Sequence, residues 1–397
     1  MRRLRDKLRW WWVASASQHV RSARRRWVLL GLLAAAVAAG IVALVAGGGG
    51  ILPAERIAGT RADANPYDGR SPRAPAAASQ RVLLQLQRPP LAGVPGVQDL
   101  TPEARRDYVA SLKREAQALR GALKARGVRI DEVVAFERAW NGFAATVRTR
   151  DLAAISSLGV RAQPVRRFYP ALGEPVPVAA AGRPDAPRAG APAAGATAPA
   201  VALLASGVGG PREALDEPGY DAVDRDLDPS PGTDPRDARR REAGGTALAG
   251  VLAAAGVRVR PIRVAGLQAG PSAAQAEEYA TSDQLLAGLE RAVDADGDGD
   301  TGDHAAVALV AVSAPYAGFA ASPEAQAVAG ARRLGTLVVA PAGGEGAARA
   351  PSGTVGSPAA ARAALAVGAL AASAPHAELR SGPLVAPDAA VLAGAAP

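Results

Sequence analysis

The feature that most constrains the fold is an alternation of short apolar segments with helical patterns from residue 200 onward. The apolar segments read AVALLASG, VRVRPIRVAG, HAAVALVAVSA, TLVVAPAG and AARAALAVGAL, and the helical patterns read GTALAGVLAAAG, SDQLLAGLERAVD and SPEAQAVAGARRLG. Strands that are apolar on both faces must be covered on both faces, and a helix between two strands makes them parallel. Residues 200–397 are therefore predicted to form a parallel α/β sheet with helices on both faces.

Residues 81–170 show a different order of elements. RVLLQLQ (Arg81–Gln87) has the pattern of a strand, and Thr101–Gly127 that of a helix, with a Thr-Pro pair at its start and a Gly at its end. Two strands joined by a turn at Asn141-Gly142, a short helix over 151–158 and a final strand that ends in VRRFYP complete the range. This strand–helix–strand–strand–helix–strand order predicts an α+β domain of the ferredoxin-like type.

The N-terminus combines a basic tail with an uncharged stretch. Residues 1–26 contain nine basic residues and one acidic residue, so most of the net charge of +9 lies in this tail. The rest of the chain is close to neutral, so we expect no nucleic-acid partner. Residues 27–46 carry no charge over twenty positions, which is long enough to cross the hydrocarbon core of a bilayer. The arginines before them predict a cytoplasmic N-terminus and an extracellular remainder.

A cleaved signal peptide is the alternative for this stretch, although such peptides have a shorter apolar region of about 7–15 residues. With a single transmembrane helix, the chain is predicted to contain six segments in order. These are a cytoplasmic tail (1–26), the span (27–46), a spacer (47–80), the α+β domain (81–170), an Ala/Pro/Gly linker (171–199) and the α/β domain (200–397).

Stretches of residues 81–397, taken in order, resemble the subtilisin-like serine proteases, or subtilases. The loop after the family's first catalytic strand is similar to PGYDAVDRDLDP. A helix and acidic insertion of one bacterial subgroup is similar to SDQLLAGLERAVDADGDGDTGDH. The stretch after the family's oxyanion residue is similar to GTVGSPAAARAALAVGA. AWNGFAATVRTRDLAAISSLGVRAQPVRRFYP resembles the second half of the family's inhibitory propeptide. The resemblance implies a subtilisin-like fold, incomplete here, preceded by a propeptide-like domain.

The resemblance also implies where catalytic groups would lie, and these positions hold other residues. ALLASGVGG places Ala205 at the catalytic Asp, GGTALAG places Gly244 at the catalytic His, and PAGGEG places Gly344 at the Asn of the oxyanion hole. The segment with the nucleophilic Ser is not found before Pro397. The chain therefore resembles a catalytically degenerate, C-terminally incomplete member of the family, and no catalytic residue is predicted.

Residue chemistry leads to the same expectation without the family. A serine nucleophile needs a base to take its proton and donors for the oxyanion. The histidines are His19, His304 and His376, and none is predicted to lie near the first strand or the small-residue helix of the α/β domain. A carboxylate base, Glu213 or Asp237, is the alternative, but no nucleophile motif accompanies either residue.

DADGDGDTGDH is a candidate metal site. Asp294, Asp296, Asp298 and Asp300 alternate along it, and Gly299 is sixth in the run, as in the first half of a calcium-binding loop. Carboxylates held close together repel one another without a cation, which favours Ca²⁺ as a cofactor. The twelfth position is not the usual Glu, and a solvated Asp-Gly turn is the alternative.

These observations predict a membrane-anchored, extracellular subtilase homologue without protease activity, serving as a binding or regulatory module. Its expected partners are the cell membrane, through residues 27–46, and another subtilase or an extracellular protein. Two alternatives remain open. One is a serine-type endopeptidase, if the chain is a fragment or uses non-standard residues, and the other is a decaying gene product without a retained role.

Overall fold

The computed structural model describes residues 79–171, 200–210, 215–216, 218–234, 236–269, 276–315, 322–343 and 355–368. The predicted tail and membrane span, the spacer up to residue 78 and the linker from residue 172 lie outside the described residues. Within the described part of the chain, no helix combines the length and apolar character that crossing a bilayer requires.

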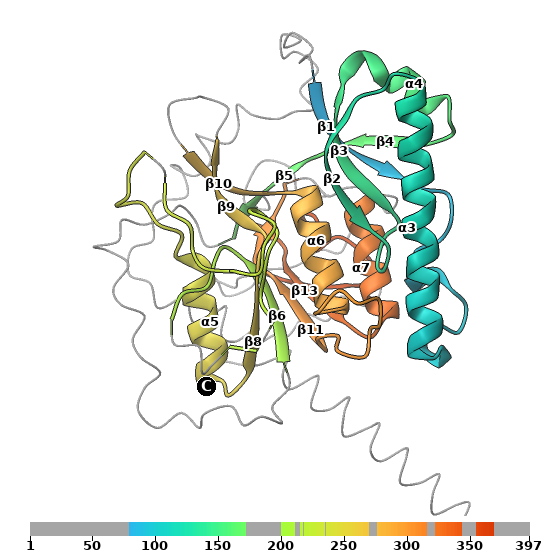
Figure 1. The fold of residues 1–397 in the computed structure, drawn as a ribbon. Coiled ribbons are helices and arrows are strands. Elements are labelled where there is room, and N and C mark those ends of the chain that lie inside the picture. The colour runs from blue at the N-terminus through green and yellow to red at the C-terminus, as the bar shows by residue number, and fades with distance from the viewer. Residues whose placement is uncertain are drawn as a thin grey trace, which may run out of the picture.

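Residues 79–171, here the N-terminal unit, contain a four-stranded antiparallel sheet in the order β2-β3-β1-β4 (Figure 1). Its strands are β1 (Ser79–Gln85), β2 (Ile130–Phe136), β3 (Gly142–Arg148) and β4 (Arg161–Pro164). Its helices are α3 (Pro102–Ala125) and α4 (Leu152–Ser156), with short 3-10 turns η2 (Leu91–Gly93), η3 (Val97–Asp99) and η4 (Thr149–Asp151). The strand order and directions are those of the predicted ferredoxin-like arrangement.

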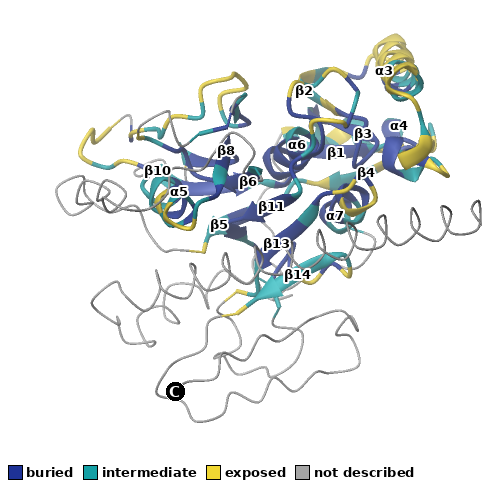
Figure 2. Ribbon diagram, turned by 90° about the horizontal axis from the view of Figure 1, so that it is seen from below, coloured by how far each residue is buried: buried dark blue, intermediate teal, exposed yellow. Residues whose placement is uncertain are grey.

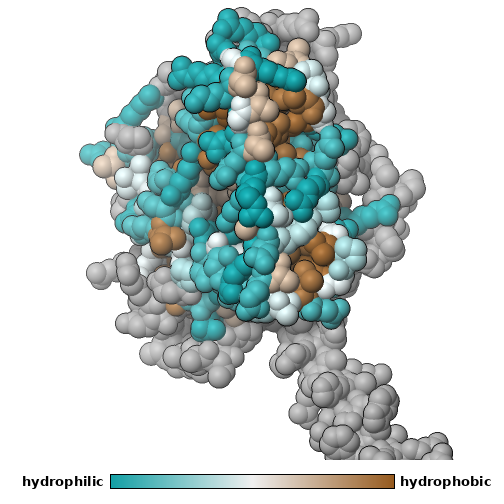
Figure 3. All heavy atoms as spheres, turned by 45° about the vertical axis from the view of Figure 1, so that its right-hand side comes forward, coloured by the Kyte–Doolittle hydropathy of each residue, from teal (hydrophilic) through white to brown (hydrophobic). Residues whose placement is uncertain are grey.

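Helix α3 forms where the Thr-Pro pair predicts it. The Thr101 hydroxyl accepts a hydrogen bond from the Ala104 N–H over 3.3 Å, and Pro102 begins the helix. Gly127 follows its end with a φ of +74°, a conformation that glycine adopts without strain. One face of α3 packs with α4 against the sheet, and the other is exposed. The surface on this side of the molecule is largely hydrophilic, with apolar side chains in small separate patches (Figure 3).

The connection between β2 and β3 differs from the predicted turn at Asn141-Gly142. Phe136 pairs with Gly142, so residues 137–141 form the connection and Gly142 belongs to β3. A Cβ atom at Gly142 would overlap the backbone of β1 and the Trp140 ring. This glycine is therefore required for close packing rather than for a tight turn.

Residues 200–368, here the C-terminal unit, contain a six-stranded parallel sheet in the order β14-β13-β11-β6-β8-β7. These strands are β6 (Ala200–Ala205), β7 (Tyr220–Asp221), β8 (Arg258–Arg263), β11 (Val307–Val310), β13 (Leu337–Pro341) and β14 (Ala364–Val367). The helices are α5 (Gly244–Ala254), α6 (Ser282–Val293) and α7 (Pro323–Arg333). Three further strands, β9 (Ala265–Ala269), β10 (Ala276–Thr281) and β12 (Val312–Ser313), lie outside this sheet.

The parallel sheet is covered on both faces, as predicted. Along β6, Val201 and Leu203 pack with Leu248 of α5, whereas Ala202 and Leu204 pack on the side of α6 and α7. This division follows from the two-residue period of a strand, because successive side chains point to opposite faces. The inner strands β6, β8, β11 and β13 are accordingly largely buried, whereas the edge strand β14 is half-buried (Figure 2).

Helices α6 and α7 lie between the two sheets (Figures 1 and 2). One face of these helices packs on the parallel sheet, and the other packs on the sheet of the N-terminal unit. Leu83 of β1 and Trp140, each 1% exposed, belong to the same core as Leu204 of β6 and Val328 of α7. The two units therefore share one hydrophobic core rather than meeting through separate surfaces.

Gly330 of α7 tests this close packing. A Cβ atom there would overlap the backbone carbonyl of Ala139, which cannot move away as a flexible side chain could. We expect Gly330→Ala to lower the free energy of unfolding by about 1 kcal/mol or more, because the overlap outweighs the helix propensity of alanine. Gly121→Ala in α3 is the matched control, since no atom lies within 4 Å of its Cβ position. That variant should be stabilised by about 0.5–1 kcal/mol in urea unfolding, and equal responses would contradict the packing argument.

Candidate functional site

The last strand of the N-terminal unit hydrogen-bonds to the C-terminal unit instead of its own sheet. The predicted single strand ending at Pro170 is split, because β4 ends at Pro164 and β5 (Arg167–Pro170) begins after two intervening residues. Strand β5 lies between β12 and β10 in an antiparallel sheet of order β12-β5-β10-β9. Proline has no N–H to extend a ladder, which fits the end of β4 at Pro164.

Strand β5 lies between β10 and β12, and the space that it occupies between these two strands is here called the groove. Phe168 pairs with Ala280 on one side, and Tyr169 pairs with Ser313 on the other. At the far end of the groove, the Ala171 N–H donates to the Ala311 carbonyl over 2.9 Å. The chain thus enters the C-terminal unit as an added strand, which is a common way to bind an extended peptide.

Pro170 lies beside the two positions that the subtilase resemblance assigns to catalytic groups. A small pocket there is lined by Pro170, Ala205, Ser206, Gly244, Gly245, Leu248, Ala311 and Val312. Ala205 ends β6 and Gly244 begins α5, so the carboxyl edge of the sheet and the start of the helix bring them together. The third position, Gly344, lies outside the described residues. Of the eight lining residues, only Ser206 has a polar side chain.

Sequence reasoning missed a buried serine–carboxylate pair at this pocket. The Ser206 hydroxyl accepts a hydrogen bond from the Gly245 N–H over 3.0 Å and donates one to the carboxyl group of Glu278 on β10. Burial, and then the charge of Glu242, raises the pKa of Glu278 to about 7. A carboxyl group with this pKa can accept or donate a proton near neutral pH. No sequence signal identified it, because Glu278 reaches Ser206 only through the folding of β10.

A second buried carboxylate, Glu242, organises the loops around the pocket. Its side chain is fully buried and accepts hydrogen bonds from the N–H groups of Gly207, Gly232 and Leu267. The Arg263 guanidinium also binds it, over 2.8 Å and 2.9 Å. Buried charges are tolerated when they are paired and hydrogen-bonded in this way. Glu242 therefore has a structural role two residues before the helix that carries Gly244.

The other predicted acid–base candidates lie elsewhere or outside the described residues. His304 precedes β11, and its Nδ1 lies 2.7 Å from the Thr301 carbonyl, at the amino edge of the parallel sheet. Ala205 lies at the opposite, carboxyl edge. Asp237 is exposed in a turn, where it accepts a hydrogen bond from a backbone N–H. His19, Glu213 and His376 lie outside the described residues.

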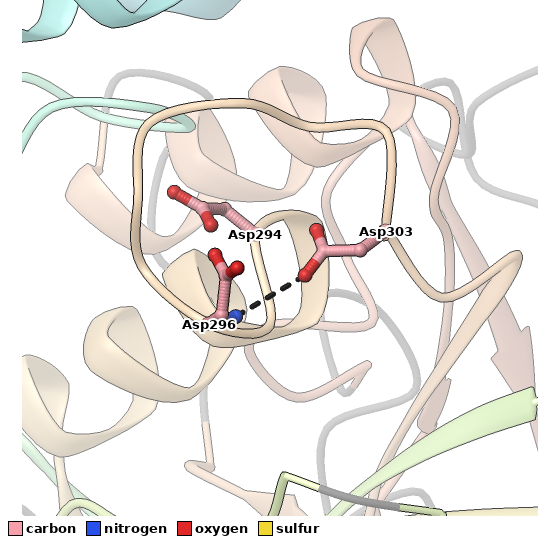
Figure 4. A group of neighbouring side chains, drawn as sticks. All are labelled: Asp294, Asp296 and Asp303. Atoms are coloured by element: carbon pink, nitrogen blue, oxygen red, sulfur yellow. Dashed lines mark hydrogen bonds between the residues drawn. The ribbon is translucent and has the colours of Figure 1, made fainter.

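The acidic loop brings together a different set of carboxylates from the predicted one. Asp294, Asp296 and Asp303 place ligand oxygens within 4.8 Å of one another (Figure 4). Asp303 also accepts hydrogen bonds from the N–H groups of Ala295 and Asp296. Three converging carboxylates fit the oxygen chemistry of Ca²⁺ in part. Asp303, nine residues after Asp294, was not among the predicted ligands.

Asp298 and Asp300, which were predicted as ligands, bind arginines of the N-terminal unit instead. Asp298 lies 2.8 Å from the Arg106 guanidinium, and Asp300 lies 2.9 Å from that of Arg105. Both arginines come from the first turn and a half of α3, which the sequence places almost 200 residues away. The local sequence does not contain these cationic partners, so it could not predict the two ion pairs.

Glu290 of α6 anchors the N-terminal unit. Its carboxylate accepts hydrogen bonds from the backbone N–H groups of residues 137–140, over 2.7–3.3 Å. Arg138 adds a 2.5 Å contact to Asp294 and a 2.8 Å hydrogen bond to the Gly297 carbonyl. Burial, followed by the charge of Glu290, raises the pKa of Glu137 to about 7. This cluster fixes the connection between β2 and β3 on the C-terminal unit.

Comparison with known proteins reveals only a distant likeness. No family model and no curated protein matches the chain. Among solved structures, it is similar to the epidermin leader peptide-processing serine protease from Staphylococcus aureus, at 12% identity and a TM-score of 0.34. The match covers 68% of this chain and 61% of that structure, so the chain spans about three fifths of its length. A likeness this distant carries no argument about the site.

The raised pKa values of Glu137 and Glu278 predict how stability depends on pH. Glutamate in an unfolded chain titrates near 4.3, whereas these two groups titrate near 7 in the fold. Between about pH 5 and pH 7, the folded protein holds protons that the unfolded chain has released, so stability falls as the pH rises through this window. Urea unfolding at several pH values should show this slope. Glu137→Gln and Glu278→Gln should each reduce it, and Glu103→Gln, at an exposed site, should leave it unchanged.

Calcium binding by the acidic loop remains a prediction. If Asp294, Asp296 and Asp303 hold the ion, adding Ca²⁺ at about 100 times its Kd should stabilise the protein by about 2.7 kcal/mol. Asp296→Asn and Asp303→Asn should remove this gain, because each removes one ligand charge. A melting temperature unchanged by Ca²⁺ in the unmodified protein would contradict the prediction.

Proposed function

We propose that this protein is a catalytically inactive subtilase homologue that binds extended peptides in the groove between β10 and β12. The observation that carries the proposal is the meeting of Ala205, Gly244 and Pro170 at one pocket. A methyl group and a hydrogen stand where the family's chemistry requires a carboxylate and an imidazole. The groove itself is formed and accepts a strand, so peptide binding does not need the missing groups.

Protease chemistry depends on the groups that this pocket lacks. The family's serine needs an imidazole to take its proton and a carboxylate to orient that imidazole. Removing these groups costs several orders of magnitude in rate, and loss of an oxyanion donor on its own costs a factor of about 10²–10³. The likeness to a serine protease concerns the general fold, and it does not bear on activity.

The binding role rests on the way β5 is held. Hydrogen bonds from both neighbouring strands satisfy an incoming backbone whatever its sequence, and alternate side chains enter pockets on either face. In this chain the occupant is the end of the N-terminal unit, so the groove is blocked until that unit or its last strand moves away. Such a module could regulate a second subtilase or another extracellular protein, or be regulated by it.

We further propose that residues 27–46 anchor the protein in the cell membrane, with the described units on the outer side. Support comes from the sequence, namely an uncharged stretch of bilayer length preceded by Arg21, Arg24, Arg25 and Arg26. Fusing a reporter that is active only outside the cytoplasm after Pro397 tests the orientation. Activity of that fusion is the expected result, and activity of a cytoplasmic reporter at the same position would contradict it.

A second candidate function, serine-type endopeptidase, is favoured by the Ser206–Glu278 pair. A hydroxyl that is hydrogen-bonded to a carboxyl group of pKa about 7 has a base beside it, although the Gly245 N–H donates to the same oxygen and so opposes its attack. The pair is nevertheless buried: Ser206 is 4% exposed and Glu278 is 6% exposed. A substrate carbonyl would need to displace part of β5 to reach the hydroxyl.

A fluorophosphonate probe, which reacts with activated serines, separates the two functions. We expect no labelling of the full chain above the level of Ser206→Ala, because no imidazole lines the pocket. Labelling that is lost in both Ser206→Ala and Glu278→Gln would establish the endopeptidase candidate instead. Ser230→Ala serves as the matched control, since its hydroxyl is bonded to Asp228 in a loop and should not affect labelling.

A further inference from the structure

We propose that the groove between β10 and β12 selects extended peptides with the pattern arginine, aromatic residue, any residue, proline, and that Glu277 and Tyr279 are the residues that select the arginine. This inference rests on the proposed peptide-binding function and names the class of ligand. The bound strand β5 has this pattern in Arg167–Pro170. Each of the three specified positions meets a distinct chemical environment.

The arginine position is defined by an aromatic ring and a carboxylate of the C-terminal unit. The Arg167 guanidinium carbon lies 4.3 Å from the centroid of the Tyr279 ring, and its Nη1 lies 3.5 Å from Glu277 Oε2. Both Tyr279 and Glu277 belong to β10, which forms one wall of the groove. A planar guanidinium stacks on an aromatic face and pairs with a carboxylate at once, whereas a lysine ammonium lacks the planar stacking surface.

The aromatic position is an apolar pocket within the shared core. Phe168 is fully buried and pairs with Ala280, whose small side chain leaves room for a ring. The Arg166 guanidinium carbon lies 5.9 Å from the centroid of the Phe168 ring, which places a cation beside it. Burial of an aromatic side chain contributes more to binding than any partly exposed ion pair. We therefore expect this position to dominate the affinity.

The proline position depends on the same substitutions that remove the family's catalytic groups. Pro170 lines the small pocket together with Ala205, Gly244 and Leu248, which are small or apolar residues. Proline supplies no N–H, and the backbone donor at this end of the groove is Ala171. A rigid apolar ring therefore fits here without leaving a donor unpaired. The position of Tyr169, on the opposite face of β5, is left without an assigned preference.

The occupant of the groove in the intact chain is tethered, so a free peptide competes with a high local concentration of β5. The test therefore uses the full chain with Arg167→Ala and Phe168→Ala, which weakens β5 in its own groove. The probe is a fluorescein-labelled peptide of residues 165–171, Val-Arg-Arg-Phe-Tyr-Pro-Ala, and binding is measured by fluorescence anisotropy. We expect this variant to bind the peptide, and the unmodified chain to bind it at least tenfold more weakly.

Three peptide changes test the pattern. We expect alanine at the phenylalanine to weaken binding at least thirtyfold, and alanine at the second arginine or at the proline to weaken it about three- to tenfold. In the protein, Glu277→Gln and Tyr279→Leu should each remove most of the preference for arginine over alanine, without weakening the alanine peptide. Asp131→Asn, at an exposed carboxylate of β2, is the matched control and should leave the preference intact.

A charge swap gives a result that altered folding cannot imitate. Glu277→Arg should bind the peptide with glutamate at the second arginine more tightly than the original peptide. If the double variant of β5 fails to fold, Arg167→Ala alone keeps Phe168 in the core and allows the same measurements at higher peptide concentration. If alanine at the arginine, the phenylalanine and the proline leaves the affinity of the peptide unchanged, the proposed specificity is wrong, although the groove still binds peptides. If no peptide binds to a folded β5 variant, both the specificity and the proposed binding function fail.

Discussion

The structure depends on the capture of a backbone segment by one carboxylate. Glu290 binds the N–H groups of residues 137–140, and no side chain of that segment is needed for these four bonds. The segment would otherwise bury unpaired donors, each costing about 1–3 kcal/mol. Residues 137–140 are fixed on α6, and the sheet of the N-terminal unit lies across α6 and α7. The chain that leaves this sheet then enters the groove as β5. The position of β5 is thus a consequence of a bond made about 30 residues before it.

Charge complementarity supports the same contact. Residues 79–171 contain sixteen arginines and lysines against eight acidic residues, whereas residues 200–368 contain fourteen against twenty-one. The near-neutral remainder predicted from composition is therefore two units of opposite charge. Ion pairs join them across the interface: Arg81–Asp283, Arg105–Asp300, Arg106–Asp298, Arg138–Asp294 and Arg167–Glu277. Such pairs contribute more to the choice and orientation of a partner than to affinity, and they weaken with salt.

The features that the sequence predicted are those that depend on neighbouring residues or on a regular apolar pattern. The Thr-Pro pair at residues 101–102 fixed the start of α3, and the apolar alternation gave the parallel sheet with helices on both faces. The sequence also placed Ala205 and Gly244 together through resemblance alone. It could not assign β5 to a sheet, because a four-residue strand carries no signal for its partner. Nor could it predict that Asp298 pairs with Arg106, or that Glu278 lies at Ser206, since both depend on contacts between residues far apart in the chain.

Strand β5 belongs to the N-terminal unit by sequence and to the C-terminal unit by hydrogen bonding. Its two ladders run antiparallel to it on either side, so a pull along the chain loads both ladders in shear. Bonds loaded in shear share the force and break together, unlike those of a hairpin that is unzipped from one end. Under tension along the chain, strand β5 is therefore held by its bonds to β10 and β12 together, and only its release would open the groove.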